Sequence, residues 1–71
     1  MTSDQGHAIY SILSAFNPNQ TVLKIGTALI EISECRNFDE RHAVLMHHFG
    51  YMKLRQFGSM SRAISKVLDK S

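Results

Sequence analysis

The chain has 71 residues, of which 44% are apolar, and its net charge is +2, so it has room for one domain (1–71) with one small core. A chain of this size buries only about 60% of its unfolded surface, which leaves little space for a catalytic pocket. Its single cysteine, Cys35, excludes an intramolecular disulfide and fits a reducing cytoplasm. Self-association remains a route to extra stability, so we expect a homodimer, with the four methionines available for adaptable contacts.

No segment has the composition of a membrane anchor or an export signal. The first six residues are polar, and the longest apolar stretch, residues 27–30, is far shorter than the roughly 20 residues of a membrane span. We therefore expect a soluble cytoplasmic protein that does not engage membranes.

The first predicted helix covers residues 3–16. Its apolar side is formed by Ile9, Ile12, Leu13 and Phe16 at helical spacing. Ser3 or Asp4 is the expected N-cap. The sequence Asn17-Pro18-Asn19 ends this helix, because proline disfavours helical geometry at the residue before it.

The second predicted helix begins at Asn19 or Thr21 and ends at Cys35. Its inner side contains Val22, Ile25, Ala28, Leu29, Ile32 and Cys35. Ile30 lies off this side, which predicts a helix that is buried on two sides. Gly26 costs about 1 kcal/mol relative to alanine and can permit a close helix crossing.

The third predicted helix follows Asn37. The spacing from Asn37 to Glu40 matches a capping box, with asparagine in place of serine or threonine. Its expected inner residues are Leu45, Met46, Phe49 and Met52. Two readings of Gly50 stay open: it ends this helix, or it lies inside a helix that continues to Phe57.

The last predicted helix follows a break at Gly58, with Ser59 as its cap. Its apolar residues are Met60, Ala63, Ile64, Val67 and Leu68. The opposite side carries Arg62, Ser65, Lys66 and Asp69. The chain as a whole is therefore predicted to be an all-α domain of four to five helices, and it shows no strand signal.

The residue types used in catalysis do not form a local motif. The spacing of His42, His47 and His48 places no two of them on one helical side, as a zinc site requires. Cys35 has no neighbouring base at a spacing that would activate it. We therefore expect no metal, no cofactor and no enzymatic activity.

The basic residues are unevenly distributed. The first 35 residues carry one lysine against three carboxylates, whereas residues 36–71 carry seven basic side chains against three acidic ones. This asymmetry favours an anionic partner for the C-terminal half, although small basic surfaces are also common without one.

Residues 50–68 resemble the helix-turn-helix of small repressors and phage regulators. In that family a glycine in the turn follows an apolar residue, and apolar residues recur six and nine positions later. Phe57, Gly58, Ile64 and Val67 occupy those places. Leu54, Lys53 and Ser59 depart from the family pattern, which favours a small residue four before the glycine and apolar residues five before and one after it.

The resemblance implies a transcriptional regulator whose last helix enters the major groove of double-stranded DNA. Arg62 would bind guanine, and Ser61 and Ser65 would contact bases or phosphates. The phosphate contacts would come from Lys53, Arg55, Lys66 and Lys70.

A protein-interaction module, an inhibitor or adaptor that binds a larger protein, is the alternative function. Aromatic residues, methionine and arginine are enriched in protein interfaces. The candidates here are Tyr10, Met46, Tyr51, Met52, Arg55 and Phe57. A plain dimerisation domain with a solvated basic side is a third possibility.

Overall fold

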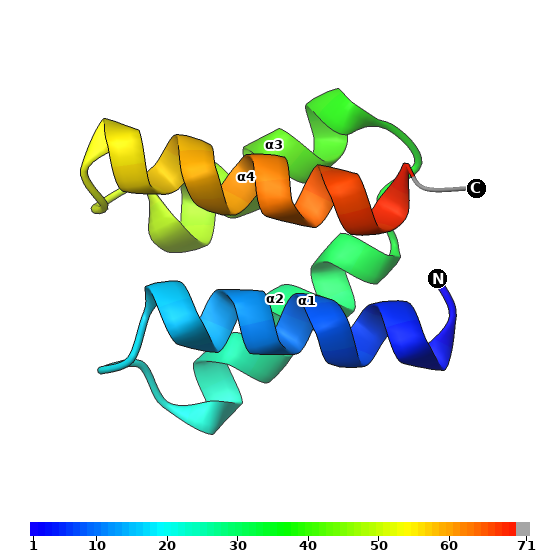
Figure 1. The fold of residues 1–71 in the computed structure, drawn as a ribbon, viewed down its shortest axis with the longest axis horizontal. Helices are drawn as coiled ribbons and strands as arrows, with labels where there is room; N and C mark the ends of the chain where they lie inside the picture. Colours follow the sequence, from blue (N-terminus) through cyan, green and yellow to red (C-terminus); the bar gives the residue numbers. More distant parts are fainter. Residues whose placement is uncertain (70–71) are drawn as a thin grey trace.

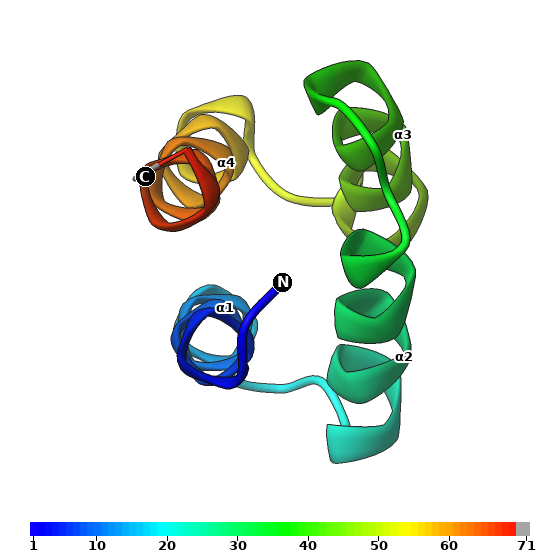
Figure 2. The same ribbon diagram turned by 90° about the vertical axis from the view of Figure 1, so that its right-hand side faces the viewer.

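The computed structural model describes residues 1–69 as four helices: α1 (Ser3–Phe16), α2 (Val22–Ser33), α3 (Phe38–Phe49) and α4 (Leu54–Leu68). The predicted all-α class is confirmed, and this part of the chain contains no strand. Helices α1 and α4 run antiparallel side by side (Figure 1), and α2 and α3 form a second layer behind them (Figure 2). Each helix contacts the next in sequence, and α1 contacts α4, so the four helices close into a ring.

The core lies inside this ring. It is formed by Ile9, Leu13, Ile25, Ala28, Ile32, Leu45, Phe49, Phe57, Met60 and Ile64, all of them at most 6% exposed. Every helix contributes to it, so no helix can leave without exposing apolar surface that water disfavours.

Helix α1 has the predicted bounds, but its predicted cap was wrong. Thr2 is the N-cap: its hydroxyl accepts a hydrogen bond from the Gln5 backbone N–H at 3.1 Å. The Gln5 side chain accepts one from the Thr2 backbone N–H at 2.9 Å, which completes a capping box. Ser3 and Asp4 already lie inside the helix.

Helix α2 buries one side only, which corrects two predictions. Ile25, Ala28 and Ile32 are in the core as expected, but Val22 is 75% exposed and Ile30 is 62% exposed. The reason is geometric: α1 and α3 are the helices that contact α2, and they cover the same side of it. The other side of α2 faces solvent.

Helix α3 begins after Asn37, as its capping motif predicts. The Asn37 side chain accepts a hydrogen bond from the Glu40 backbone N–H at 2.9 Å. The Glu40 carboxylate accepts from the backbone N–H of Arg36 at 2.7 Å rather than from that of Asn37, so half of the capping box is formed. The helix ends at Phe49 with Gly50 as its C-cap, which confirms the shorter of the two predicted lengths.

The inner side of α3 differs from the predicted one. Leu45 and Phe49 are buried as expected, but Met46 is 46% exposed. The third buried residue of α3 is Arg41, at 8% exposure. Met52 lies in the turn after the helix, half-buried against the core.

A buried asparagine connects the two turns at the far end of the molecule. Asn17 is 4% exposed and donates a hydrogen bond to the Leu13 carbonyl at 2.9 Å. Its side-chain oxygen accepts from the Tyr51 hydroxyl at 2.5 Å, and that hydroxyl accepts from Gln20 at 3.0 Å. The α1–α2 turn therefore holds the α3–α4 turn, and through it the start of α4.

Helix α4 runs without interruption through Gly58, so the predicted break at Gly58 and the Ser59 cap were wrong. Phe57 and Met60, on either side of the glycine, are both buried and continue one apolar side. Their burial outweighs the roughly 1 kcal/mol that an interior glycine costs a helix. The true turn lies at residues 50–53, and Lys53 is the N-cap, without a side-chain capping bond.

The two glycines should respond to alanine in opposite ways. A Cβ at Gly58 would lie 3.5 Å from the nearest atom, Nη1 of Arg62, so Gly58→Ala should raise the free energy of unfolding by about 0.5–1 kcal/mol. A Cβ at Gly50 would lie 2.5 Å from the Met46 carbonyl oxygen, so Gly50→Ala should lower it. Urea denaturation measures both; a loss at Gly58 would contradict the continuous helix.

Candidate nucleic-acid interface

Helix α4 presents three cations on the side that faces away from the core. Arg55, Arg62 and Lys66 are all exposed and are separated by seven and four residues, which returns each to the same side of the helix. We call these three residues the basic side of α4. They span about 16 Å along the axis, at 1.5 Å per residue. The opposite side carries buried Met60 and Ile64, so packing fixes which side is presented.

The cations of the basic side are available to an external anion. Within residues 1–69, the ion pair is Arg41–Asp69, and His48 contacts the Glu31 carboxylate; neither contact includes a residue of the basic side. The Arg62 guanidinium makes a long contact of 3.4 Å with the Ser59 hydroxyl. Lys53, exposed at the start of α4, adds a fourth cation near the same helix.

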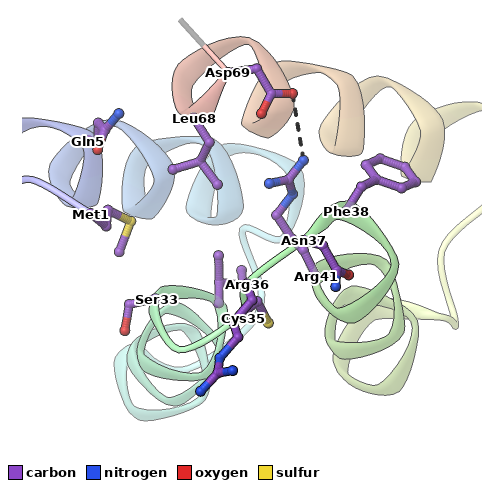
Figure 3. A pocket seen from close by; sticks show the side chains of 11 residues that line it. Met1, Gln5, Ser33, Cys35, Arg36, Asn37, Phe38, Arg41, Leu68 and Asp69 are labelled. Atoms are coloured by element: carbon purple, nitrogen blue, oxygen red, sulfur yellow. Dashed lines mark ion pairs between the residues drawn. The ribbon is translucent and has the colours of Figure 1, made fainter. Parts of the chain in front are cut away.

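Arg41 anchors the end of α4 to α3. Its guanidinium donates to the Ser65 hydroxyl at 3.0 Å and lies 3.8 Å from the Asp69 carboxylate (Figure 3). It also lies 5.4 Å from the centre of the Phe38 ring. The Asp69 carboxylate is paired with Arg41 and stays 68% exposed, at the C-terminal end of the row that carries Arg62 and Lys66.

The residues predicted to bind DNA fall into three groups. Lys53, Arg55, Arg62 and Lys66 are exposed and lie on or at the start of α4. Ser61 is 8% exposed on the core side, and Ser65 is half-buried with its hydroxyl bonded to Arg41, so these two serines do not lie among the exposed cations. Both lie on or beside the packed side of a helix that begins six residues earlier than expected. Lys70 lies outside the described residues.

Arg41 is a structural residue that the sequence analysis missed. A signal for it exists: it lies four and eight residues before Leu45 and Phe49, in register with the buried side of α3. An arginine at such a position must find partners for its charge when it is buried. Nothing local identifies those partners, because Ser65 and Asp69 are 24 and 28 positions away in the sequence.

A cleft of about 320 Å³ opens between the α2–α3 connection, the N-terminus and the end of α4 (Figure 3). Cys35 lines it, and its thiol donates to the Glu31 carbonyl at 3.2 Å. Burial, and then the nearby Glu40 carboxylate, raise the pKa of the Cys35 thiol. The thiol therefore stays protonated at neutral pH, which makes it a poor nucleophile.

Alkylation measures this property of Cys35. Because its pKa is raised in the folded state, thiolate forms at a higher pH than in the unfolded chain. We expect iodoacetamide to react several-fold more slowly with the native protein than with the urea-unfolded protein at pH 8. The difference should shrink as the pH rises through the raised pKa. Cys35→Ser gives the background, and faster reaction of the native protein would contradict the assignment.

Two histidines have packing partners. The His42 ring stacks on Phe38 at 5.6 Å and meets the edge of Phe57 at 5.5 Å, and its buried Nδ1 has no hydrogen-bond partner. His48 Nε2 lies 3.1 Å from the Glu31 carboxylate and joins α3 to α2. These contacts assign both rings to the helix packing.

No protein-family model, curated protein or solved structure matches this chain. None of the helices in residues 1–69 has the length and apolar character needed to cross a membrane.

Proposed function

We propose that the protein binds double-stranded DNA through the basic side of α4. The observation that carries this proposal is that Arg55, Arg62 and Lys66 share one exposed side of a helix whose opposite side is locked into the core. Three unneutralised cations in a row attract an anion that is itself extended and regularly charged. A duplex, with one negative charge per roughly 1.7 Å of axis, has that form.

The dimensions of α4 suit the major groove. An α-helix with its side chains is about 10–12 Å across, and the major groove of B-DNA is about 12 Å wide. Arg55 lies in the first turn of α4, where recognition helices contact base edges. Arg62 can donate two hydrogen bonds to a guanine, and Lys53 and Lys66 can neutralise flanking phosphates.

The arrangement of α3, a short turn and α4 also supports the proposal of DNA binding. Phe49 is a buried apolar residue before Gly50, as in the helix-turn-helix pattern, and four residues (50–53) separate the helices. In the helix-turn-helix pattern, apolar residues follow the turn glycine by six and nine positions. Here the buried Phe57 and Met60 follow Gly50 by seven and ten positions, one more in each case. A turn that is one residue longer accounts for that offset.

Fluorescence anisotropy with a labelled mixed-sequence duplex tests the proposal. On a mixed-sequence duplex, which offers no selected guanine, we expect Arg55 and Arg62 to contact phosphates as Lys53 and Lys66 do. With four such contacts, log affinity should fall with log salt at a slope of about −3.6, roughly a hundredfold between 50 and 200 mM. Absence of binding at the lower salt, with helicity verified by circular dichroism, would overturn it.

A second candidate function is supported by the exposed corner between α3 and α4. Met46, Tyr51 and Leu54 are 46%, 61% and 86% exposed, beside Arg55, and these residue types favour protein interfaces. Of the other predicted contact residues, Phe57 is buried, and Tyr10 and Met52 pack against the core. A protein partner bound at this corner should be lost with Leu54→Glu and retained with Arg62→Ala, the reverse of the result expected for DNA.

A further inference from the structure

We propose that a second copy of this chain covers the exposed side of α2, forming a homodimer in which the two α2 helices pack antiparallel about Gly26. The proposal names a partner and a surface, and it stands independently of the DNA-binding proposal. It is carried by the side chains of α2, by the space over Gly26 and by the symmetry of the spacing around that glycine.

The exposed side of α2 is apolar along the length of the helix. Its exposed apolar side chains are Val22, Leu23 and Ile30, with Gly26 between them and the exposed hydroxyl residues Thr27 and Ser33 beside them. Leu29, at the edge of this side, is half-buried against the core. Val22, Leu23 and Ile30 are 75%, 80% and 62% exposed. The charged residues of α2, Lys24 and Glu31, are not among them. Three large aliphatic side chains on one uncharged side are typical of a surface that another protein covers.

The single chain does not account for Gly26. A Cβ placed there would meet no atom within 4 Å, and its backbone has no positive φ angle, so alanine would fit the helix. A glycine in mid-helix is destabilising, and the chain nevertheless has one at the centre of the exposed apolar side. A glycine at that point lets a second helix backbone approach closely.

The apolar residues are arranged symmetrically about that glycine. Val22 and Ile30, both exposed, lie four residues to either side of it. In an antiparallel pair centred on Gly26, Val22 opposes Ile30 of the second copy, and the exposed Leu23 of each copy lies along the same edge of the contact. A two-fold axis would therefore place the same patch of the two copies in contact, which is the usual form of a homodimer interface. Antiparallel packing also places opposite helix dipoles side by side.

The size of this surface predicts the strength of the dimer. Twelve residues of helix are about 18 Å long, and one helix side of that length buries less than the roughly 800 Å² per partner of a standard interface. We therefore expect a weak dimer, with a dissociation constant in the micromolar range. Because α2 makes no contact with α4 and lies in the other layer, the dimer leaves the basic side of α4 exposed (Figure 2).

Analytical ultracentrifugation from micromolar to millimolar concentration tests the interface. The wild type should associate, and Ile30→Lys should raise the dissociation constant by about tenfold or more. Gly26→Ala should stabilise the monomer yet weaken the dimer, two effects of opposite sign. Gly6→Ala in α1 is the matched control, because its Cβ also meets no atom within 4 Å; it should not change association. A wild type that is monomeric throughout, or unchanged association of the Ile30 variant, would overturn the proposal.

A mixing experiment tests the orientation. At a concentration near the dissociation constant of the wild type, Val22→Glu and Ile30→Lys should each be mostly monomeric when alone, with helicity retained because both positions are exposed. The two variants mixed should associate, because antiparallel pairing opposes the new glutamate to the new lysine of the other chain. A mixture that stays monomeric would overturn the antiparallel arrangement. The same variants should bind a DNA duplex as the wild type does, because neither substitution lies on α4. Failure of the dimer and failure of DNA binding can therefore be told apart.

Discussion

The double substitution Arg62→Ala/Lys66→Ala is expected to weaken binding to a DNA duplex by about a hundredfold at low salt. Each side chain lies on the basic side of α4 without an ionic partner among residues 1–69, so neither substitution removes an ion pair described there. The salt dependence should fall with the affinity, from a log–log slope of about −3.6 to about −1.8, because two of four phosphate contacts are gone. Anisotropy titrations at several salt concentrations give both quantities.

The matched control removes the same charge from another part of the molecule. Lys24 lies on α2 and Arg36 in the α2–α3 connection, so neither belongs to the basic side of α4. Lys24→Ala/Arg36→Ala should leave affinity within a few-fold of the wild type, since screening limits the effect of distant charges. Equal losses in the two double variants would show that net charge, rather than the basic side, drives binding.

Replacing Asn17 with alanine should have the largest effect on stability among the single substitutions discussed. Asn17 is 4% exposed; its side-chain amide donates a hydrogen bond to the Leu13 carbonyl and accepts one from the Tyr51 hydroxyl. Alanine leaves that carbonyl without its side-chain donor and opens a gap, a loss of about 1–3 kcal/mol. For a domain of this size each kcal/mol lowers the melting temperature by about 4–8 °C, so thermal denaturation should detect the change readily.

Two further variants separate the hydrogen bonds of Asn17 from effects of the turn itself. Asn19→Ala changes an exposed asparagine of the same turn and should be nearly neutral. Tyr51→Phe removes one of the bonds of Asn17 and should cost about 1 kcal/mol. If Asn17→Ala proved no more destabilising than Asn19→Ala, the buried cluster would have no structural role.

Features that depend on a few adjacent residues were predictable. The bounds of α1 follow from its apolar spacing and the proline after it, and the start of α3 follows from the Asn37 cap. Two of the four exposed cations at α4, Arg62 and Lys66, were identified on the correct helix, because they oppose Met60 and Ile64 at helical spacing. Arg55 lies before the predicted break at Gly58, so the sequence did not place it in the same row. The turn was misplaced, because Gly50 and Gly58 carry the same local signal.

The sequence by itself determined that the chain is helical and where α1 and α3 begin. It also determined that a row of basic residues runs along the last helix. These features were predictable because hydrogen bonds and side-chain periodicity within a helix involve neighbours a few residues apart. Only the tertiary structure decided which side of each helix is buried. Helix α4 passes through Gly58 because α1 and α3 cover Phe57 and Met60, and Arg41 is tolerated inside because Ser65 and Asp69 come from another helix. Val22 and Ile30 stay exposed because no helix of the same chain reaches them. Those outcomes depend on contacts between distant parts of the chain, whose energies no local pattern contains.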